Sequence, residues 1–106
     1  MVAADPKIER AAQALLRAAP GSRVILFGSA ARGEARLGSD LDFLVIEPRV
    51  GSRRAEMVRL SDALRETGIY ADVLVVSEDF FRETSEVPGT LLFNAARLGI
   101  EFHGAA

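Results

Sequence analysis

The amino-acid sequence predicts an α/β layered domain, because segments with helical spacing alternate with short apolar runs that have the pattern of strands. Helices are expected where apolar residues recur three and four positions apart, and buried strands where they follow one another without that period. Such alternation is typical of a sheet with helices packed on it. The length of 106 residues suits one domain with one core.

Two longer helices are expected. Asp5 and Pro6 fit the N-cap and the first position of a helix that ends at Pro20-Gly21. Its apolar stripe consists of Ile8, Ala11, Ala12, Leu15 and Leu16. The second helix spans 53–67 and stops at Gly68. The residues that we expect it to place in the core are Ala55, Val58, Leu60, Ala63 and Leu64.

Two shorter helices follow in the second half of the chain. Ser77 is expected to cap a helix that runs through Arg82, and Pro88-Gly89-Thr90 to start a last helix that runs to Leu98. Gly99 is expected to end that last helix.

Three strands are expected at 24–27, 40–46 and 69–76, and a short edge strand at 100–102. Gly28-Ser29 breaks the first strand, and Ala30-Ala31-Arg32 is expected to start a short helix. The predicted order is helix, strand, helix, strand, helix, strand, helix and short strand.

Composition excludes several classes of protein. The chain has no cysteine and one histidine, His103, so it has neither a disulfide framework nor a metal site built from thiolates or several histidines. A formal net charge of -2 argues against general nucleic-acid binding, which usually needs a basic excess. No apolar run reaches the roughly 20 residues of a membrane span, and the start lacks the pattern of a signal peptide. We expect a cytoplasmic protein.

The most informative side chains are acidic. Asp40 and Asp42 lie two positions apart at the start of the second predicted strand, so their side chains share one face. Neighbouring carboxylates repel, and aspartate is uncommon in strands. A lone Asp-x-Asp pair more often lies at a solvated strand mouth. A third acid, Asp72, near the start of the next strand, favours a site for two divalent cations that promotes phosphoryl or nucleotidyl transfer.

A phosphate site is predicted beside these acids. Gly28 and Ser29 follow a strand and precede the expected short helix, so free backbone N–H groups and a hydroxyl would point toward a ligand. Arg32 lies one turn further on and is suited to a phosphate oxygen. A glycine–serine pair alone is weak evidence, since most such pairs form simple turns.

These residues together resemble a known family. Gly28-Ser29, ten residues, and then Asp40-x-Asp42 match the signature of the DNA polymerase β-like nucleotidyltransferase superfamily. The longer stretch GSAARGEARLGSDLDFLVIE is similar to its minimal nucleotidyltransferase branch, and the resemblance extends to Asp72 and to the closing segment PGTLLFNAARLGIEF. It implies that residues 1–106 form a single minimal nucleotidyltransferase domain, with one small mixed sheet flanked by helices.

The resemblance also implies residue roles. Gly28 and Ser29 would hold the β- and γ-phosphates of a nucleoside triphosphate, with ATP as the default, and Arg32 and Ser39 would assist. Asp40 and Asp42 would bind two Mg²⁺ ions. Asp72 would complete the catalytic metal site and help to deprotonate an acceptor hydroxyl, which attacks the α-phosphorus as pyrophosphate leaves.

Minimal nucleotidyltransferases are often paired with a small helical HEPN-type protein in a toxin–antitoxin module. The resemblance implies an antitoxin that transfers AMP to a tyrosine of such a partner. One alternative is a non-catalytic antitoxin that neutralises its partner by occlusion, and another is an enzyme with a small-molecule acceptor. The sequence does not fix the nucleotide, the acceptor, the number of units transferred or the oligomeric state.

The acid-bearing face of the sheet is apolar away from the acids, because Leu44 and Ile46 share a face with Asp42, and Leu74 and Val76 share one with Asp72. We expect another subunit, identical or different, to cover part of this face. The alternative is that helices of the same chain cover it.

Overall fold

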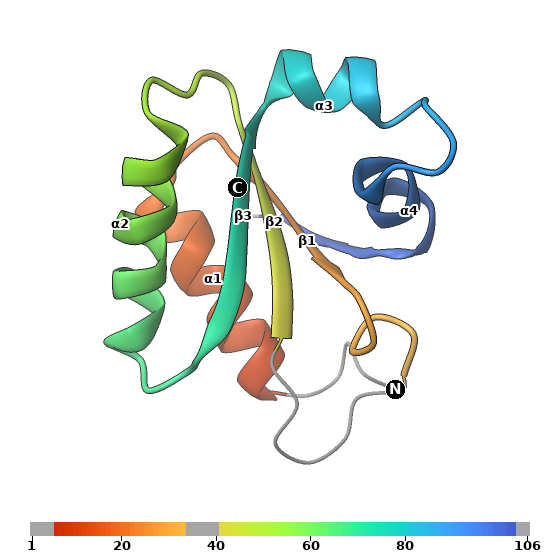
Figure 1. The fold of residues 1–106 in the computed structure, drawn as a ribbon. Helices are drawn as coiled ribbons and strands as arrows, with labels where there is room; N and C mark the ends of the chain where they lie inside the picture. The colour runs from red at the N-terminus through yellow and green to blue at the C-terminus, as the bar shows by residue number, and fades with distance from the viewer. Residues whose placement is uncertain (1–5, 34–40, 104–106) are drawn as a thin grey trace.

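The chain folds around a four-stranded mixed sheet (Figure 1). This computed structural model describes residues 6–33 and 41–103. The strands are β1 (Arg23–Phe27), β2 (Leu41–Glu47), β3 (Ala71–Ser77) and β4 (Ile100–Phe102), in the order β3-β2-β1-β4. Strands β2 and β3 are parallel, whereas β1 is antiparallel to both of its neighbours. The predicted α/β class and edge strand are confirmed.

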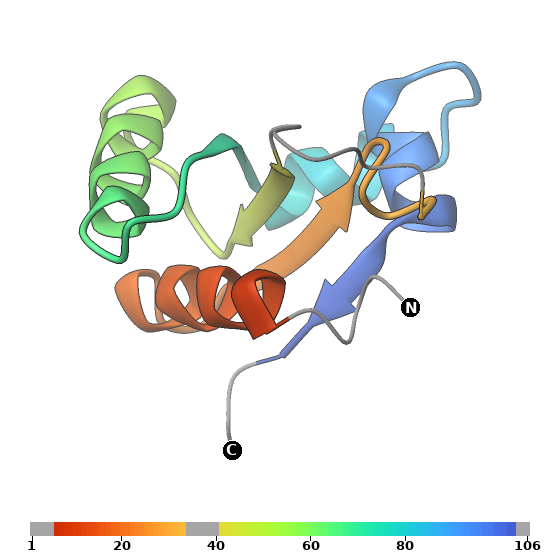
Figure 2. The ribbon, with the colours of Figure 1, turned by 90° about the horizontal axis from the view of Figure 1, so that it is seen from below.

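Helices cover both faces of the sheet (Figure 2). Helices α1 (Pro6–Ala18) and α2 (Arg53–Arg65) pack on one face, and α3 (Glu78–Thr84) and α4 (Leu91–Leu98) on the other. The helix starts follow from local chemistry, because the hydroxyls of Ser52, Ser77 and Thr90 accept hydrogen bonds from backbone N–H groups of the first turns. No helix in the described part of the chain has the length and apolar character needed to cross a membrane.

Alternation along the strands divides the core in two. Phe43 and Val45 of β2 join the larger core beneath α1 and α2. Leu44 and Ile46, on the opposite face, join a smaller core with Ile25, Val76, Phe81, Leu92 and Ala95. Leu44 and Ile46 have no exposed surface, and Leu74 is half-buried. Helices α3 and α4 of the same chain therefore cover most of this face, which is the alternative given above, and Leu74 is the member that they leave partly open.

Two other local predictions are also wrong. Residues 29–33 form turns rather than the start of a helix, with Arg32 N–H donating to the Ser29 carbonyl and Gly33 N–H to the Ala30 carbonyl, both at 3.2 Å. In α2, Ala55 and Val58 are exposed instead of buried, and Val58 shows 57% of its surface. Leu60 and Leu64 are the buried members of that helix, as predicted.

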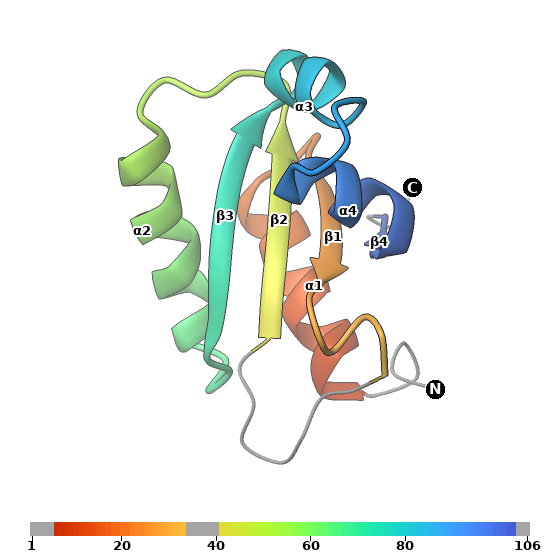
Figure 3. The ribbon, with the colours of Figure 1, turned by 45° about the vertical axis from the view of Figure 1, so that its right-hand side comes forward.

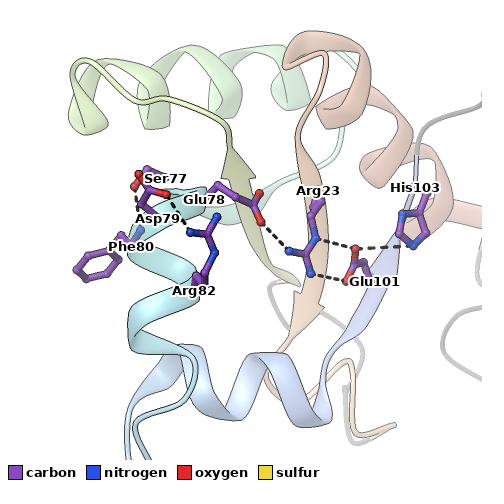
Figure 4. Close-up of polar contacts among 8 residues, drawn as sticks. All are labelled: Arg23, Ser77, Glu78, Asp79, Phe80, Arg82, Glu101 and His103. Carbon is purple, nitrogen blue, oxygen red and sulfur yellow. Dashed lines mark hydrogen bonds and ion pairs between the residues drawn. The ribbon is translucent and has the colours of Figure 1, made fainter.

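Arg23 joins three elements at the end of the sheet where β1 begins (Figure 4). Its guanidinium donates to both carboxylate oxygens of Glu101 in β4, at 2.9 and 3.0 Å, and to Glu78 in α3 at 3.0 Å. The guanidinium also lies 5.1 Å from the centre of the Phe81 ring. These charge-assisted contacts raise the pKa of Arg23 and lower that of Glu101, and they fix α3 and β4 against β1.

A carboxyl pair ties β2 to α2. The Oε2 atom of Glu47 is buried and has no hydrogen-bond partner among the described residues. Burial, followed by the hydrogen bond and charge of Glu56, raises the Glu47 pKa to about 7. Arg59 donates to Glu56 at 2.7 and 2.9 Å and is the main reason why the Glu56 pKa falls to about 2. Arg59 also donates to the Ala18 carbonyl at 2.8 Å, which connects α2 to α1.

The raised pKa of Glu47 predicts how the stability of the folded chain depends on pH. The folded chain keeps the Glu47 proton up to about pH 7, whereas the ordinary glutamate pKa is 4.5. Because the folded state binds more protons in that window, the free energy of unfolding should fall as pH rises from about 5 to 8. Glu47→Gln removes the ionisation, so we expect this variant to be more stable than the parent by roughly 1–2 kcal/mol at pH 8 and nearly equal at pH 5.

Urea unfolding at pH 5, 6, 7 and 8 measures this difference. Exposed Glu83 provides a matched control, and Glu83→Gln should follow the parent at every pH. Parallel stability curves for Glu47→Gln and the parent would show that Glu47 is not protonated in the folded chain.

Candidate active site

The predicted site lies at the end of the sheet where β1 finishes and β2 and β3 begin (Figure 3). The antiparallel pairing of β1 with β2 places Phe27 opposite Asp42. The parallel pairing of β2 with β3 places Asp42 opposite Asp72. The third strand along the chain therefore neighbours the second, which brings Asp72 beside Asp42. Three neighbouring strands, β1, β2 and β3, bring one apolar and two acidic residues into one row.

Asp42 and Asp72 are neighbours across the β2–β3 pair. Their Cα atoms are partners in the register, and adjacent strands lie about 4.8 Å apart. Asp42 is half-buried and Asp72 is exposed. Two carboxylates this close raise each other's electrostatic energy unless a cation lies between them. Asp40 and Ser39, the other predicted site residues of this segment, lie outside the described residues.

Gly28 brings the backbone directly against the Asp42 carboxylate. Its φ of +77° lies in the left-handed region that favours glycine. A Cβ atom added there would lie 2.5 Å from Asp42 Oδ2 and 3.3 Å from Asp42 Cγ. A side chain at this position would require the Asp42 carboxylate to move. The glycine is therefore required both by its backbone angle and by the carboxylate that it contacts.

The turn after Gly28 replaces the predicted helix start, and this changes the groups that a phosphate would meet there. Ser29 is half-buried and Arg32 is exposed, and both lie on the turn that connects β1 to the segment before β2. Because this segment is not helical, a helix dipole does not contribute there. A ligand at this turn would meet backbone N–H groups, the Ser29 hydroxyl and the Arg32 guanidinium instead.

Two hollows meet at this end of the sheet. An open groove of about 620 Å³ contains both Asp42 and Asp72 and extends over the edge strand β3 to α2, where Val58, Ser61 and Arg65 line it. A smaller pocket of about 290 Å³ begins at Gly28 and Arg32 and extends along α4. Phe27 and Leu91 line both hollows and lie where the two meet.

The sequence reasoning missed the residues that shape these hollows. The apolar character of Val58 and Leu91 predicts that both lie in the core, but both side chains are exposed and line the groove. Asn94 lines the smaller pocket. Asn94 is one of two polar side chains in a short and mostly apolar helix, and this is the signal in the sequence that points to it.

Carboxylates are the metal-ligand type that this site offers. Asp42 and Asp72 provide hard oxygen donors of the kind that divalent cations such as Mg²⁺ prefer. Within residues 6–33 and 41–103, no group of three or more histidine, cysteine, aspartate or glutamate side chains is placed to hold a metal ion. Of the three predicted metal ligands, the structure therefore describes Asp42 and Asp72.

Comparisons with known proteins agree with this geometry. Residues 8–98 match the family described as Nucleotidyltransferase domain. No curated protein shows significant similarity to the chain. Among solved structures, the fold is similar to a chain from a crystal structure of a toxin-antitoxin with AMP-PNP, with a TM-score of 0.52 and 24% identity. That similarity covers 93% of this chain and 72% of the other, and at this identity it concerns the fold.

The family match spans most of the sequence, including the Gly28 turn and both described acids, and the mixed sheet with helices on both faces is consistent with a polymerase β-like fold. The chain belongs to the nucleotidyltransferase domain family and is a nucleotidyltransferase.

Proposed function

We propose that this chain transfers a nucleoside monophosphate, AMP from ATP, to a hydroxyl group in a Mg²⁺-dependent reaction. The observation that carries the proposal is the row at the end of the sheet, in which Asp42 lies beside Asp72 and the Gly28 backbone contacts Asp42. Two carboxylates and a turn that begins at a glycine offer a metal site next to a phosphate site.

The turn is the proposed site of the β- and γ-phosphates. Gly28 allows a phosphate to approach the backbone closely, and the Ser29 hydroxyl can donate to a phosphate oxygen. Arg32 supplies positive charge on the same turn. Ser39 is proposed to assist from the segment outside the described residues.

The acids are proposed to hold two Mg²⁺ ions. Asp42 and Asp72, together with Asp40, would be the protein ligands, and their oxygen donors fit this cation. Bound Mg²⁺ would stabilise the charge that develops on the transferring phosphoryl group. In the reaction, Asp72 helps to remove the proton from the acceptor hydroxyl. A bond forms from the acceptor oxygen to the α-phosphorus, the bond from that phosphorus to the β-phosphate oxygen breaks, and pyrophosphate leaves.

The proposed acceptor is a tyrosine of a HEPN-type toxin, so that the chain acts as an antitoxin. The fold is shared with a chain from a toxin-antitoxin structure that contains a nucleotide analogue. The larger groove is open beside exposed Asp72, and exposed Val58 and Leu91 line it, so a protein segment could reach the acids there. The same exposed apolar residues favour the alternative, a binding antitoxin that acts without catalysis.

Replacing the acids separates these two functions. We expect Asp42→Asn and Asp72→Asn each to slow transfer by roughly 100-fold or more, because each removes a proposed metal ligand. Intact-mass spectrometry of the chain with its neighbouring gene product, ATP and Mg²⁺ measures the added nucleoside monophosphate. Asp79→Asn is the control, since Asp79 is exposed on α3 and forms its ion pair in the described part of the chain with Arg82.

Transfer at the parental rate by both acid variants would refute the proposed catalytic site. A stable complex that shows no added mass with the parent protein would favour the binding antitoxin.

Substitution of Gly28 tests the contact between the turn and the acid. Gly28→Ala places a Cβ against Asp42 Oδ2 and forces alanine into left-handed backbone, a conformation that costs roughly 1–2 kcal/mol. We expect transfer to slow by about 100-fold, because the carboxylate must move. Gly51→Ala is the matched control, since nothing lies within 4 Å of its added Cβ. Full activity of Gly28→Ala would contradict the close approach.

A further inference from the structure

The pocket along α4 differs chemically from the acidic groove. We call it the α4 pocket; it is lined by Phe27, Gly28, Arg32, Leu91, Asn94 and Leu98, with Ala95 and Gly99 behind them. Its walls are mostly apolar, and the side chains of Arg32 and Asn94 are its polar groups. Leu91 and Leu98 expose 49% and 59% of their surface there. A concave apolar surface with a few convergent polar groups is the usual form of a small-molecule site.

Tight packing fixes the position of α4 beside this pocket. A Cβ atom at Gly99 would overlap the Ala95 carbonyl oxygen and Ile25 Cγ2 and lie 2.9 Å from the Leu26 carbonyl oxygen. The end of α4 therefore sits directly on β1, the strand that leads to Gly28. This packing sets the width of the pocket between the helix and the turn.

Asn94 places a solvent-exposed side-chain amide on the wall of this pocket. Within the described part of the chain, its side chain makes no hydrogen bond, although its backbone N–H donates to the Thr90 carbonyl at 3.2 Å. Asparagine is a poor helix former, so helix stability does not explain its position. Arg97, the other polar side chain of α4, lies over the Phe93 ring at 5.1 Å and does not line the pocket.

We propose that the α4 pocket receives the nucleobase of the nucleoside triphosphate and that the Asn94 amide contacts the edge of the base, favouring adenine. This inference rests on the proposed function, since it takes the Gly28 turn as the phosphate site. An amide offers one donor and one acceptor side by side, the pattern that matches N7 and the N6 amino group of adenine. The apolar walls suit the faces of a flat aromatic ring.

The size and position of the pocket agree with this assignment. Its volume of about 290 Å³ lies at the lower end of the range for ligand pockets, which suits a nucleoside and not a whole triphosphate. It begins at Gly28, so a nucleotide with its phosphates on the turn has its base within reach of α4. The acidic groove on the other side of Phe27 and Leu91 then remains open for the acceptor.

Nucleotide discrimination tests the role of Asn94. The probes are AMP-PNP, GMP-PNP and inorganic tripolyphosphate, titrated by calorimetry with Mg²⁺ into the full chain. A good bidentate contact discriminates between bases by about tenfold or more, so Asn94→Ala should weaken AMP-PNP binding roughly tenfold. Binding of tripolyphosphate should not change. Arg97→Ala, on the same helix but outside the pocket, should match the parent with every probe.

A second variant, Asn94→Arg, tests for a change in base preference instead of a loss of nucleotide affinity. Arginine pairs with O6 and N7 of guanine, so Asn94→Arg should shift the ratio of AMP-PNP to GMP-PNP affinity toward guanine by about tenfold. Because the added positive charge strengthens the binding of both nucleotides alike, this general gain in affinity cancels in the ratio of the two affinities.

The outcomes separate this inference from the proposed function. If the parent chain binds the nucleotides but neither variant changes the ratio, the assignment of the base to Asn94 is wrong and the proposed function stands. If Asn94→Ala weakens the binding of tripolyphosphate as much as the binding of AMP-PNP, the pocket holds phosphates, and the assignment of the base to this pocket is again wrong. If the parent binds neither nucleotide nor tripolyphosphate, both proposals fail.

Discussion

The register between β2 and β3 is the constraint on which the site depends. Parallel pairing with Asp42 opposite Asp72 places two like charges on neighbouring strands, an arrangement that works against stability on its own. The rest of the sheet compensates, because residues further along the same two strands are buried in two cores. A shift of the register by one residue would turn Asp72 away from Asp42 and toward the larger core beneath α1 and α2. The apolar core therefore fixes the position of the acids.

The strand pairing of the sheet and the packing of its helices also explain why the acids can be reached from two directions. The antiparallel pairing of β1 with β2 sets Phe27 beside Asp42 and leads the chain into the Gly28 turn. Helix α4 returns to β1 through the close contact at Gly99 and so encloses one side of the turn. The opposite side, over the edge strand β3, is bounded by α2 and by Leu91 at the start of α4, and it remains an open groove. A nucleotide and an acceptor can therefore approach the row of acids from different directions, which an in-line displacement requires.

Much of the fold could be predicted from local chemistry. The caps at Ser77 and Thr90, the stops near Gly68 and Gly99, and the alternation along β2 all depend on neighbouring residues in the sequence. The turn at 29–33 could not, because Ala30-Ala31-Arg32 has good helix propensity while the turn is set by its attachment to β1 and by Gly33 with a φ of +74°. Val58 was misplaced because its spacing fits the core stripe although that side of α2 faces the groove. Strand order and the antiparallel direction of β1 depend on tertiary contacts, which the periodicity of a sequence does not reveal. The resemblance to a family implied that the sheet is mixed.

Locating the metal and the nucleotide together tests the central claim most directly. A crystal structure of the chain with AMP-PNP and Mn²⁺, with anomalous scattering used to find the manganese, would place both without any assumption about the acceptor. We predict manganese bound to the carboxylates of Asp42 and Asp72, with the phosphates of the nucleotide against the Gly28 turn. A nucleotide bound elsewhere, or manganese that is coordinated without either carboxylate, would contradict the account.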